Sequence, residues 1–462
     1  MFSREIYVQR RENLRNSIKS GIILMPGNDE IPMNYVGNPY YFRQDSSFLY
    51  YFGLDQPALT AVIDVDENDC ILFGDDFSLD DVIWMGPHEP LRDLAAEVGI
   101  ENVESSRSLE TVLGKAIKNK RTVHFLPPYS ENQKANYIFY LNMKRESLSA
   151  KASLPLTKAV IKQRSIKIDE EIKEIEKAHA ISYDMHMTAM RMAKAGIYER
   201  DIAGVIEGIA LAAGGFVAFP IILSRQGEIL HNHSHGNLLR DGDIVINDAG
   251  AENSMHYASD ITRTFPVSGK FTTQQREIYG LVLKAQTEAI NATKPGVINK
   301  EIHLTAASTI ADGLKELGLM KGDTKEAVKM GAHALFFPHG IGHMMGLDVH
   351  DMENLGEDLV GYDKDVKRSA QFGLANLRMG KKLQTGNVVT IEPGIYFIPD
   401  LIRAWQKEKK FDEFIDYTRI GDYIEFGGVR IEDDIVVMED GHQVIGNPIP
   451  KSVEDVEDIC QI

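Results

Sequence analysis

Apolar and polar positions alternate in two different ways along the chain. Over the first ~160 residues, short apolar runs alternate with stretches of helical spacing, which is typical of an α/β domain. Residues 58–65 and 71–73 predict two strands on either side of the polar turn 66–69. From about residue 165 onward, apolar positions follow the spacing of longer amphipathic helices. We therefore expect two domains, over residues 1–160 and 165–462, with the boundary between about 155 and 168.

The second region is expected to open with helices. One helix is predicted to begin at Asp169, a favourable N-cap residue, and to stop before Gly196. Further helices are predicted over 199–213, over 273–293 with a capping box at its start, and over 299–317 with Asn299 as its cap. Strand-like runs cover residues 216–224, 243–251, 256–267, 388–397 and 428–438. The whole pattern predicts the α/β (α+β) class.

Four carboxylates interrupt the strand-like runs of the second region: Asp248, Asp260, Glu392 and Glu432. Any one of them could be a strand-end carboxylate that accepts hydrogen bonds from a neighbouring loop. All four are harder to explain in this way, because an ionised carboxylate in an apolar run costs several kcal/mol unless it is paired or coordinated. Two divalent cations would offset four negative charges, so the pattern indicates a metal site.

Three histidines lie in one glycine-containing segment between the second and third of these carboxylates. His339 and His343 have the i, i+4 spacing of a zinc-binding helix, but no glutamate follows His339. Gly340 and Gly342 are also poor helix residues. Together with His350, the segment therefore indicates a loop or bulged strand that presents three imidazoles.

The composition excludes several classes of protein. With 50 Lys+Arg against 68 Asp+Glu, the formal net charge is −18, and no nucleic-acid partner is expected. The two cysteines, Cys70 and Cys460, exclude a disulfide-rich scaffold and a cysteine-rich metal site. The uncharged residues 208–224 are too short for a membrane span, and residues 1–15 lack the apolar segment of a signal peptide. We therefore expect a cytoplasmic protein without a membrane partner.

The motifs around these residues resemble the pita-bread metallopeptidase family (M24B), in its Xaa-Pro aminopeptidase and prolidase branch. The matching segments are residues 247–250, 259–266, 339–351, 391–396 and 428–434. Residues 42–46 and 83–86 look like the creatinase-like N-terminal domain of that branch. The resemblance implies a creatinase-like N-terminal α/β domain followed by a pita-bread catalytic domain.

The resemblance also implies a ligand set for two metal ions per chain: Asp248, Asp260, His343, Glu392 and Glu432. Asp260 and Glu432 would bridge the ions, Asp248 would bind one, and His343 and Glu392 would bind the other. The family implies Mn²⁺, whereas the oxygen-rich residues alone leave Co²⁺, Fe²⁺ and Zn²⁺ open.

The implied reaction is release of the N-terminal residue from peptides with proline in second position, by a hydroxide that bridges the two ions. Glu392 would also shuttle the proton to the leaving nitrogen, and His339 and His350 would lie beside the oxyanion. His231, His350 and Arg430 would contact the substrate. Arg430 could instead orient a ligand carboxylate.

Several alternatives stay open at this point. Residues 352–383 and 399–427 form long connections that look more like those of prolidase, which cleaves Xaa-Pro dipeptides. A catalytically dead family member that acts as a binding protein is a further alternative, which the intact ligand positions disfavour. The resemblance implies a homo-oligomer, a dimer or tetramer. Trp84 is expected to be a packed aromatic, with contact to a partner's active site as the alternative. His233 and His235 are expected to belong to a polar loop.

Overall fold

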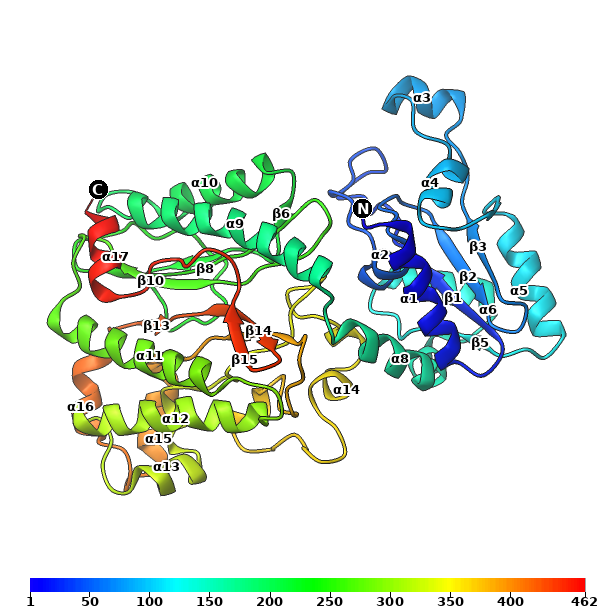
Figure 1. Cartoon of the computed structure of the whole chain (residues 1–462). Coiled ribbons are helices and arrows are strands. Elements are labelled where there is room, and N and C mark those ends of the chain that lie inside the picture. The colour runs from blue at the N-terminus through cyan, green and yellow to red at the C-terminus, as the bar shows by residue number, and fades with distance from the viewer. Residues whose placement is uncertain (462) are drawn as a thin grey trace. The chain divides into compact units, whose positions relative to one another are not determined.

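The structure is a computed structural model that describes residues 1–461 and divides into two compact units (Figure 1). The N-terminal unit comprises Met1–Arg164 and the short segment Met352–Gly356. The C-terminal unit comprises Ser165–Asp351 and Glu357–Ile462. Both units combine helices with sheets, so the predicted α/β class is confirmed. Within the described residues, no helix has the length and apolar character needed to cross a membrane.

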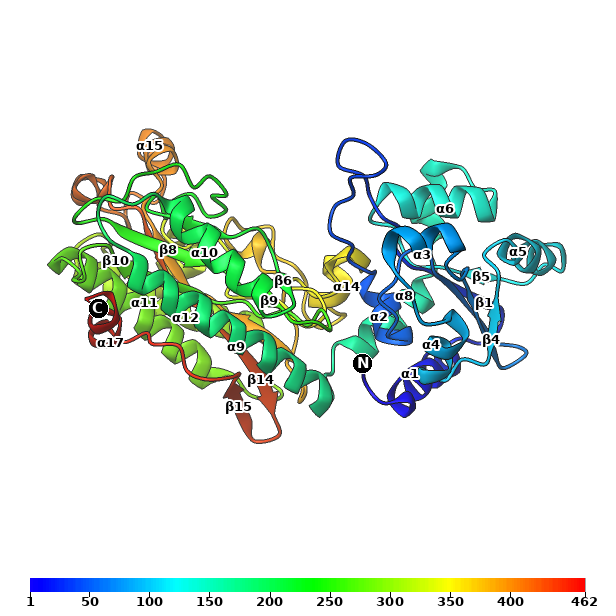
Figure 2. The same ribbon diagram turned by 90° about the horizontal axis from the view of Figure 1, so that it is seen from above.

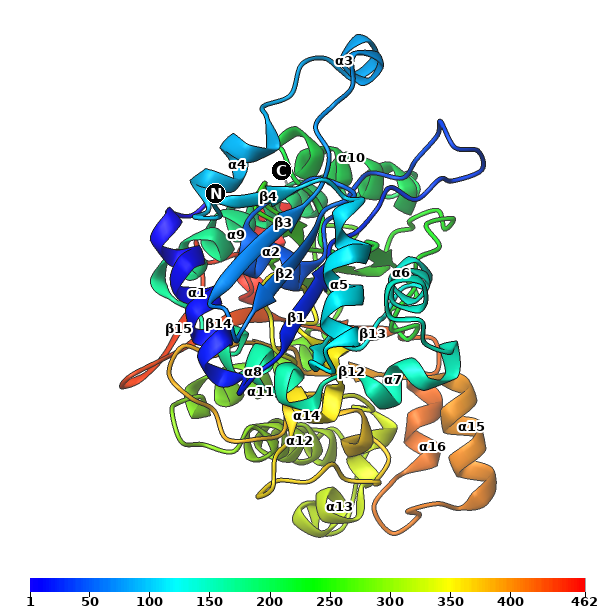
Figure 3. The ribbon, with the colours of Figure 1, turned by 90° about the vertical axis from the view of Figure 1, so that its right-hand side faces the viewer.

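The N-terminal unit is built on a five-stranded mixed sheet with the order β4-β3-β2-β1-β5 (Figure 3). The strands are β1 (Ile22–Pro26), β2 (Thr60–Asp64), β3 (Asp69–Phe73), β4 (Asn102–Glu104) and β5 (Val123–His124). The central strand β2 is antiparallel to β1 and β3, and these strands confirm the pair predicted around the turn 66–69. One face of the sheet packs into a core that includes Leu24, Val62, Phe73, Leu113 and Tyr137.

Eight helices of the N-terminal unit surround this sheet. They are α1 (Arg4–Ser17), α2 (Ser46–Phe52), α3 (Leu79–Met85), α4 (Leu91–Glu97), α5 (Ser108–Lys118), α6 (Glu131–Leu141), α7 (Leu148–Lys151) and α8 (Leu154–Arg164). Helix α3 buries none of its residues, and Trp84 on it is 84% exposed. The expectation that Trp84 is a packed aromatic is therefore wrong within this chain.

The C-terminal unit places its strands between two pairs of helices. Helices α9 (Asp169–Met192) and α10 (Glu199–Ala212) lie side by side on one side, and α11 (Thr273–Ala292) and α12 (Asn299–Glu316) lie on the other (Figures 1 and 2). The remaining helices are α13 (Thr324–Met330), α14 (Glu357–Gly361), α15 (Pro399–Glu408), α16 (Tyr417–Ile420) and α17 (Val453–Cys460). The capping box predicted at the start of α11 is present between Thr272 and Gln275.

The strands of the C-terminal unit form two three-stranded sheets and two short pairs. One sheet has the order β10-β8-β7 and the other β11-β14-β15, and the pairs are β12-β13 and β6-β9. Their bounds are β6 (Phe216–Val217), β7 (Ile222–Ser224), β8 (Ile244–Asp248), β9 (Ala251–Glu252), β10 (Thr262–Pro266), β11 (Val388–Ile391), β12 (Gly394–Tyr396), β13 (Gly428–Arg430), β14 (Asp433–Met438) and β15 (Gly441–Val444). An isolated bridge between Thr262 and Glu432 joins the two halves of this strand system.

Two predicted helix caps are wrong. Helix α9 begins at Asp169, but its N-cap is Ile168, whose backbone N–H donates to the carboxylate of Glu171 in the first turn. Asn299 is likewise the first residue of α12 rather than its cap, because its side-chain amide donates to the carbonyl of Met379 at 2.7 Å. At α9 the Glu171 carboxylate accepts the hydrogen bond of the N-cap N–H, and at α12 a tertiary contact uses the side chain that the predicted cap would need.

Candidate metal centre and active site

The four carboxylates come together because the strands that carry them are paired. Asp248 ends β8, and it lies opposite Thr262 in the antiparallel ladder between β8 and β10. Thr262 also bridges to Glu432, and its hydroxyl donates to the Glu432 carboxylate at 2.7 Å. Asp260 precedes β10, and Glu392 follows β11. The strand ends thus converge on one place from four separate segments of the sequence.

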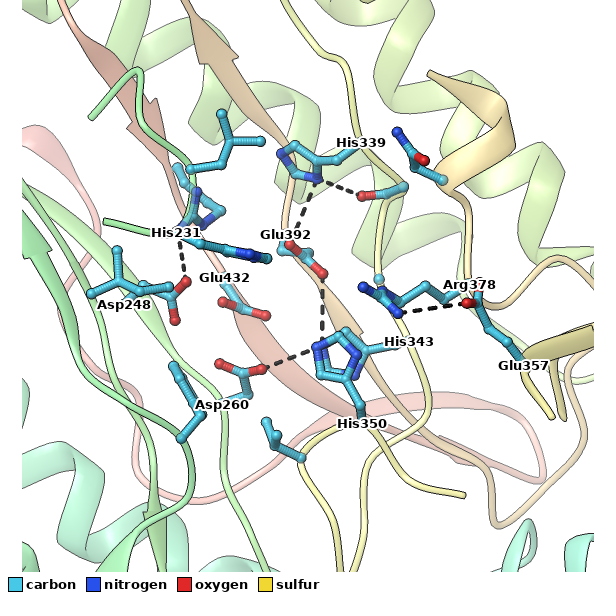
Figure 4. A pocket seen from close by; sticks show the side chains of 18 of the residues that line it. His231, Asp248, Asp260, His339, His343, His350, Glu357, Arg378, Glu392 and Glu432 are labelled. Atoms are coloured by element: carbon cyan, nitrogen blue, oxygen red, sulfur yellow. Dashed lines mark hydrogen bonds and ion pairs between the residues drawn. The ribbon is translucent and has the colours of Figure 1, made fainter. Parts of the chain in front are cut away.

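This place is a cavity of about 750 Å³ in the C-terminal unit (Figure 4). All nine residues singled out in the sequence line it: His231, Asp248, Asp260, His339, His343, His350, Glu392, Arg430 and Glu432. The structure therefore brings the predicted residues together, and their separate roles remain predictions.

A close group of possible metal ligands lies at the base of the cavity. Asp260, His343 and Glu432 each offer one possible ligand atom, and these three atoms lie within 4.8 Å of one another. All three residues are buried. Nε2 of His343 lies 3.3 Å from Oδ2 of Asp260 and 3.8 Å from Oε1 of Glu392. Carboxylate oxygens with one imidazole form a donor set that suits a divalent cation such as Mn²⁺.

The electrostatics of the cluster also fit a bound cation. Burial and the neighbouring carboxylates raise the pKa of Asp260 and Glu432 well above the usual range, and burial raises the pKa of Glu392. Among the described residues, Oδ1 of Asp248 and Oδ1 of Asp260 are buried without a hydrogen-bond partner. Buried acceptors without donors are costly, and metal ions would satisfy them while offsetting the charge.

Glycine allows the backbone to bring these side chains close. A Cβ on Gly250 would lie 1.8 Å from the carbonyl oxygen of Ser259, and one on Gly342 would lie 1.9 Å from that of Thr390. Next to Gly342, the backbone N–H of His343 donates to the Thr390 hydroxyl at 3.1 Å. The histidine segment is therefore an irregular loop packed on β11, as predicted, because a helix could not make this approach.

Arg430 contacts the cluster directly. Its Nη2 donates to Oδ2 of Asp248 at 2.6 Å, and its Nη1 donates to the hydroxyl of Tyr396 at 2.8 Å. The same hydroxyl lies 2.8 Å from Nε2 of His339, whose Nδ1 lies 2.8 Å from the carbonyl oxygen of Gly340. Because burial lowers the pKa of His339 to about 3, the ring is neutral, and the Tyr396 hydroxyl donates to it.

The sequence reasoning did not single out Tyr396, although it belongs to the quoted segment 391–396. A tyrosine in an apolar strand is usually an ordinary core residue. Tyr396 is indeed fully buried. Its importance depends on contacts with Arg430, 34 positions away, and with His339, 57 positions away. No local pattern carries that information.

The remaining histidines lie on two sides of the cavity. The ring of His350 stacks on that of His343, with centroids 3.9 Å apart and planes 18° apart. His231 is partly exposed, and its partial burial lowers its pKa. His233 also lines the cavity, whereas the ring of His235 lies 3.1 Å from the carbonyl oxygen of Ile221.

The outer wall carries a charged group that the sequence reasoning also missed. Glu357, Arg368 and Arg378 line the cavity within the long connection that follows the histidine loop. The Glu357 carboxylate lies 2.6 Å from Nη2 of Arg368. It also lies 3.7 Å from Nη1 of Arg378, an ion pair that Figure 4 shows. The unusual length of this connection was the available signal, because loops beside a cavity often supply specificity.

Comparison with known proteins gives matches over nearly the whole chain. The model of "Metallopeptidase family M24" matches residues 173–439, and that of "Aminopeptidase P, N-terminal domain" matches residues 7–124. A probable Xaa-Pro aminopeptidase of Fusarium vanettenii is 33% identical over 440 residues, which cover 94% of this chain and 89% of that protein. The Xaa-Pro dipeptidase of Homo sapiens is 28% identical over 471 residues, with 96% and 90% covered. The structure of Pseudomonas aeruginosa aminopeptidase PepP aligns with a TM-score of 0.82 at 26% identity, covering 100% of this chain and 98% of that one.

Proposed function

The chain belongs to metallopeptidase family M24, and on this premise we propose that it is an Xaa-Pro aminopeptidase that uses two Mn²⁺ ions. The family and fold predicted from the motifs are confirmed by the matches. The observation that carries the proposal is the convergence of Asp248, Asp260, His343, Glu392 and Glu432 on one cavity. The match of the N-terminal region to the aminopeptidase P domain supports the proline-directed branch.

The chain offers ligands for two ions. We propose that Asp260 and Glu432 hold both ions, that Asp248 holds one, and that His343 and Glu392 hold the other. Divalent ions supply Lewis acidity and lower the pKa of water, which is the chemistry that peptide hydrolysis needs. The intact set of ligands disfavours the alternative of a catalytically dead binding protein.

The surrounding side chains are proposed to handle protons and charge. The raised pKa of Glu392, caused by burial, suits a carboxylate that takes up a proton and passes it to the leaving nitrogen. His350, exposed to the cavity beside His343, is the proposed donor to the developing oxyanion. The same role for His339 would require one of its two ring contacts, to Gly340 or Tyr396, to open. His231 and Arg430 are the proposed contacts to the peptide.

The proposed substrate explains why a dedicated site is needed. An Xaa-Pro bond is a tertiary amide without an N–H, and it has a substantial cis population. Peptidases that bind an extended strand through backbone hydrogen bonds therefore handle it poorly. A cavity with fixed polar groups can accept the proline ring and select its position from the amino end.

An Xaa-Pro dipeptidase is the second candidate. A dipeptide carries its free carboxylate on the proline itself, and Arg368 and Arg378 on the cavity wall could pair with it. In this structure both arginines already contact Glu357, which favours longer peptides that have no carboxylate at that position. The Fusarium vanettenii relative is named a probable Xaa-Pro aminopeptidase, and the human relative is named an Xaa-Pro dipeptidase. The comparisons are therefore consistent with both candidates.

The test compares an Xaa-Pro dipeptide, an Xaa-Pro-Yaa tripeptide and an Xaa-Ala-Yaa control, each with added Mn²⁺, Co²⁺ or Zn²⁺. We expect release of the first residue from the tripeptide, most rapidly with Mn²⁺, and no cleavage of the alanine control. Cleavage of the dipeptide alone would replace the proposal with the second candidate. A preparation that binds less than one Mn²⁺ per chain would contradict the metal assignment.

Further parts of the prediction remain proposals. They are the domain boundaries at 1–160 and 165–462, a cytoplasmic location, a dimeric or tetrameric assembly, and contact of Trp84 with a neighbouring chain. The high exposure of Trp84 supports the last of these.

A further inference from the structure

Helix α9 presents two buried polar side chains to the strands that carry the metal ligands. Ser182 and His186 are one helical turn apart, and both are fully buried. Polar groups in a helix face that packs on a sheet are costly unless they have partners. Each of these two has partners, and the partners lie next to proposed metal ligands.

His186 contacts the residues on both sides of Asp248, the backbone of Ala249 and the side chain of Asn247. Its Nε2 lies 2.9 Å from the carbonyl oxygen of Ala249, and the side-chain amide of Asn247 lies 3.0 Å from its Nδ1. A carbonyl oxygen accepts and an amide N–H donates, so the ring carries its proton on Nε2 and is neutral. Burial lowers the pKa of His186 to about 3, which agrees with this state.

Ser182 makes the equivalent contacts beside Asp260. Its hydroxyl lies 2.8 Å from that of Ser259, the residue before Asp260. It also accepts a hydrogen bond from the backbone N–H of Ala251 at 3.0 Å. Since Ser259 and Ala251 belong to the two chain segments that approach each other at Gly250, the serine ties these segments together.

We propose that His186 is a positioning residue that fixes Asp248 for metal binding, and that Ser182 does the same for Asp260. Asp248 is the last residue of β8, and directly after it the backbone N–H of Ala249 donates to the carbonyl of Ile261 at 3.0 Å. The contacts of His186 with Ala249 and Asn247 add a restraint from the helix to this end of the strand. This inference rests on the proposed metal site but is independent of which peptide the site cleaves.

The test uses His186→Phe, which keeps the ring and removes both hydrogen bonds. The matched control is His179→Phe, on the same helix two turns earlier, because His179 is also buried and its Nδ1 has no partner among the described residues. Calorimetric titration of the full chain with Mn²⁺ should show affinity weaker by on the order of 10-fold for His186→Phe and little change for the control. Thermal unfolding of both metal-free variants shows whether the loss reflects general instability.

A second variant separates hydrogen bonding from packing. His186→Gln has an amide that can donate to Ala249 and a carbonyl that can accept from Asn247, so it should recover much of the Mn²⁺ affinity. If His186→Phe does not fold, Ser182→Ala and His186→Gln are compared with wild type. Unchanged Mn²⁺ affinity in His186→Phe, or a loss equal to that of His179→Phe, overturns the inference. Tight Mn²⁺ binding without Xaa-Pro cleavage by the wild type would contradict the proposed substrate and leave this inference intact.

Discussion

Arg430 donates a hydrogen bond to Asp248 across 182 positions of the sequence, with Nη2 and Oδ2 2.6 Å apart. Both side chains are nearly buried, at 4% and 12% exposed, so the pair is shielded from solvent. The guanidinium also contacts Tyr396 and the hydroxyl of Thr262. These three contacts support the hypothesis that Arg430 orients the carboxylate of Asp248. Arg430 also lines the cavity, which is consistent with the proposed contact to the substrate.

We expect Arg430→Lys to lower kcat/KM for an Xaa-Pro tripeptide by ~10- to 100-fold. Lysine keeps the charge but cannot reach Asp248, Tyr396 and Thr262 together. Steady-state kinetics at saturating Mn²⁺ measure the effect. Arg225→Lys is the control, because Arg225 pairs with Asp243 at 2.7 Å outside the cavity lining and should leave kinetics unchanged. Wild-type kinetics in Arg430→Lys would show that catalysis does not depend on the contacts of Arg430 with Asp248, Tyr396 and Thr262.

Tyr396→Phe should reduce kcat and also destabilise the protein by about 1–3 kcal/mol. The hydroxyl joins Arg430 to His339, so its loss leaves a buried guanidinium and a half-buried imidazole without this partner. Denaturant unfolding and kinetics on the same preparation measure both effects. Tyr279→Phe is a matched control: its buried hydroxyl donates to the carbonyl of Lys451 at 2.9 Å, so only stability should fall. Equal kinetics in the two variants would contradict the link to His339.

The carboxylates that line the cavity were predictable from sequence for a physical reason. Each of Asp248, Asp260, Glu392 and Glu432 places a charge in or next to an apolar run of the sequence, and such a charge needs a partner once the run is buried. The histidine loop was predictable because Gly340 and Gly342 cannot sustain the helix that the spacing would otherwise suggest. Both signals lie within short stretches of the sequence, so they can be recognised without knowledge of the fold.

The supporting residues could not be predicted in the same way. His186 lies in a helix whose apolar spacing was clear, but it contacts Asn247 and Ala249, which are 61 and 63 positions away. Glu357 contacts Arg378 only because the long connection between them folds back. The caps of α9 and α12 were misassigned because tertiary and first-turn contacts compete with intrinsic cap preference. The roles of these residues depend on contacts between distant segments, and no local pattern in a single sequence predicts such contacts.

Binding of Mn²⁺ to the metal-free protein should release protons. Burial and neighbouring carboxylates raise the pKa of Asp260 and Glu432, so the cluster retains protons that a cation must displace. Apparent Mn²⁺ affinity should therefore fall as the pH is lowered. Calorimetry in buffers of different ionisation enthalpy measures the released protons. A binding enthalpy that is independent of the buffer would contradict the raised pKa values.

Acid should destabilise the C-terminal unit partly through His333. Burial lowers the pKa of His333 to about 4 in the folded state, whereas an unfolded histidine titrates near 6.5. Between these values the unfolded state binds one more proton, so the free energy of unfolding falls as the pH decreases. From pH 7 to pH 5 this group alone should cost about 2 kcal/mol.

His333→Phe should therefore lose about 2 kcal/mol less than wild type over that pH range. Denaturant unfolding of the metal-free proteins at both pH values gives the comparison. The control is His233→Gln, because His233 is exposed and its replacement removes no buried imidazole. An identical acid response in His333→Phe would show that this imidazole does not titrate in the unfolding equilibrium.

The pair of Lys167 and Asp351 should control the stability of the histidine loop. Nζ of Lys167 lies 2.8 Å from Oδ2 of Asp351, and both side chains are 1% exposed. The backbone N–H of Asp351 donates to the carbonyl of Met344, which closes the loop that carries His343 and His350. Removing one member of a buried pair leaves the other charge without that partner, so Lys167→Met should cost about 3–5 kcal/mol.

An exposed pair in the same unit provides the comparison for this prediction. Lys177 contacts Glu174 at 2.7 Å, but its side chain is 66% exposed, so Lys177→Met should cost at most about 1 kcal/mol. The double variant Lys167→Met/Asp351→Leu should recover part of the stability lost in the single variant, because it also removes the buried carboxylate that lost its lysine. Denaturant unfolding of all three variants tests both statements. A cost for Lys167→Met no larger than that for Lys177→Met would mean that the buried pair does not hold the loop.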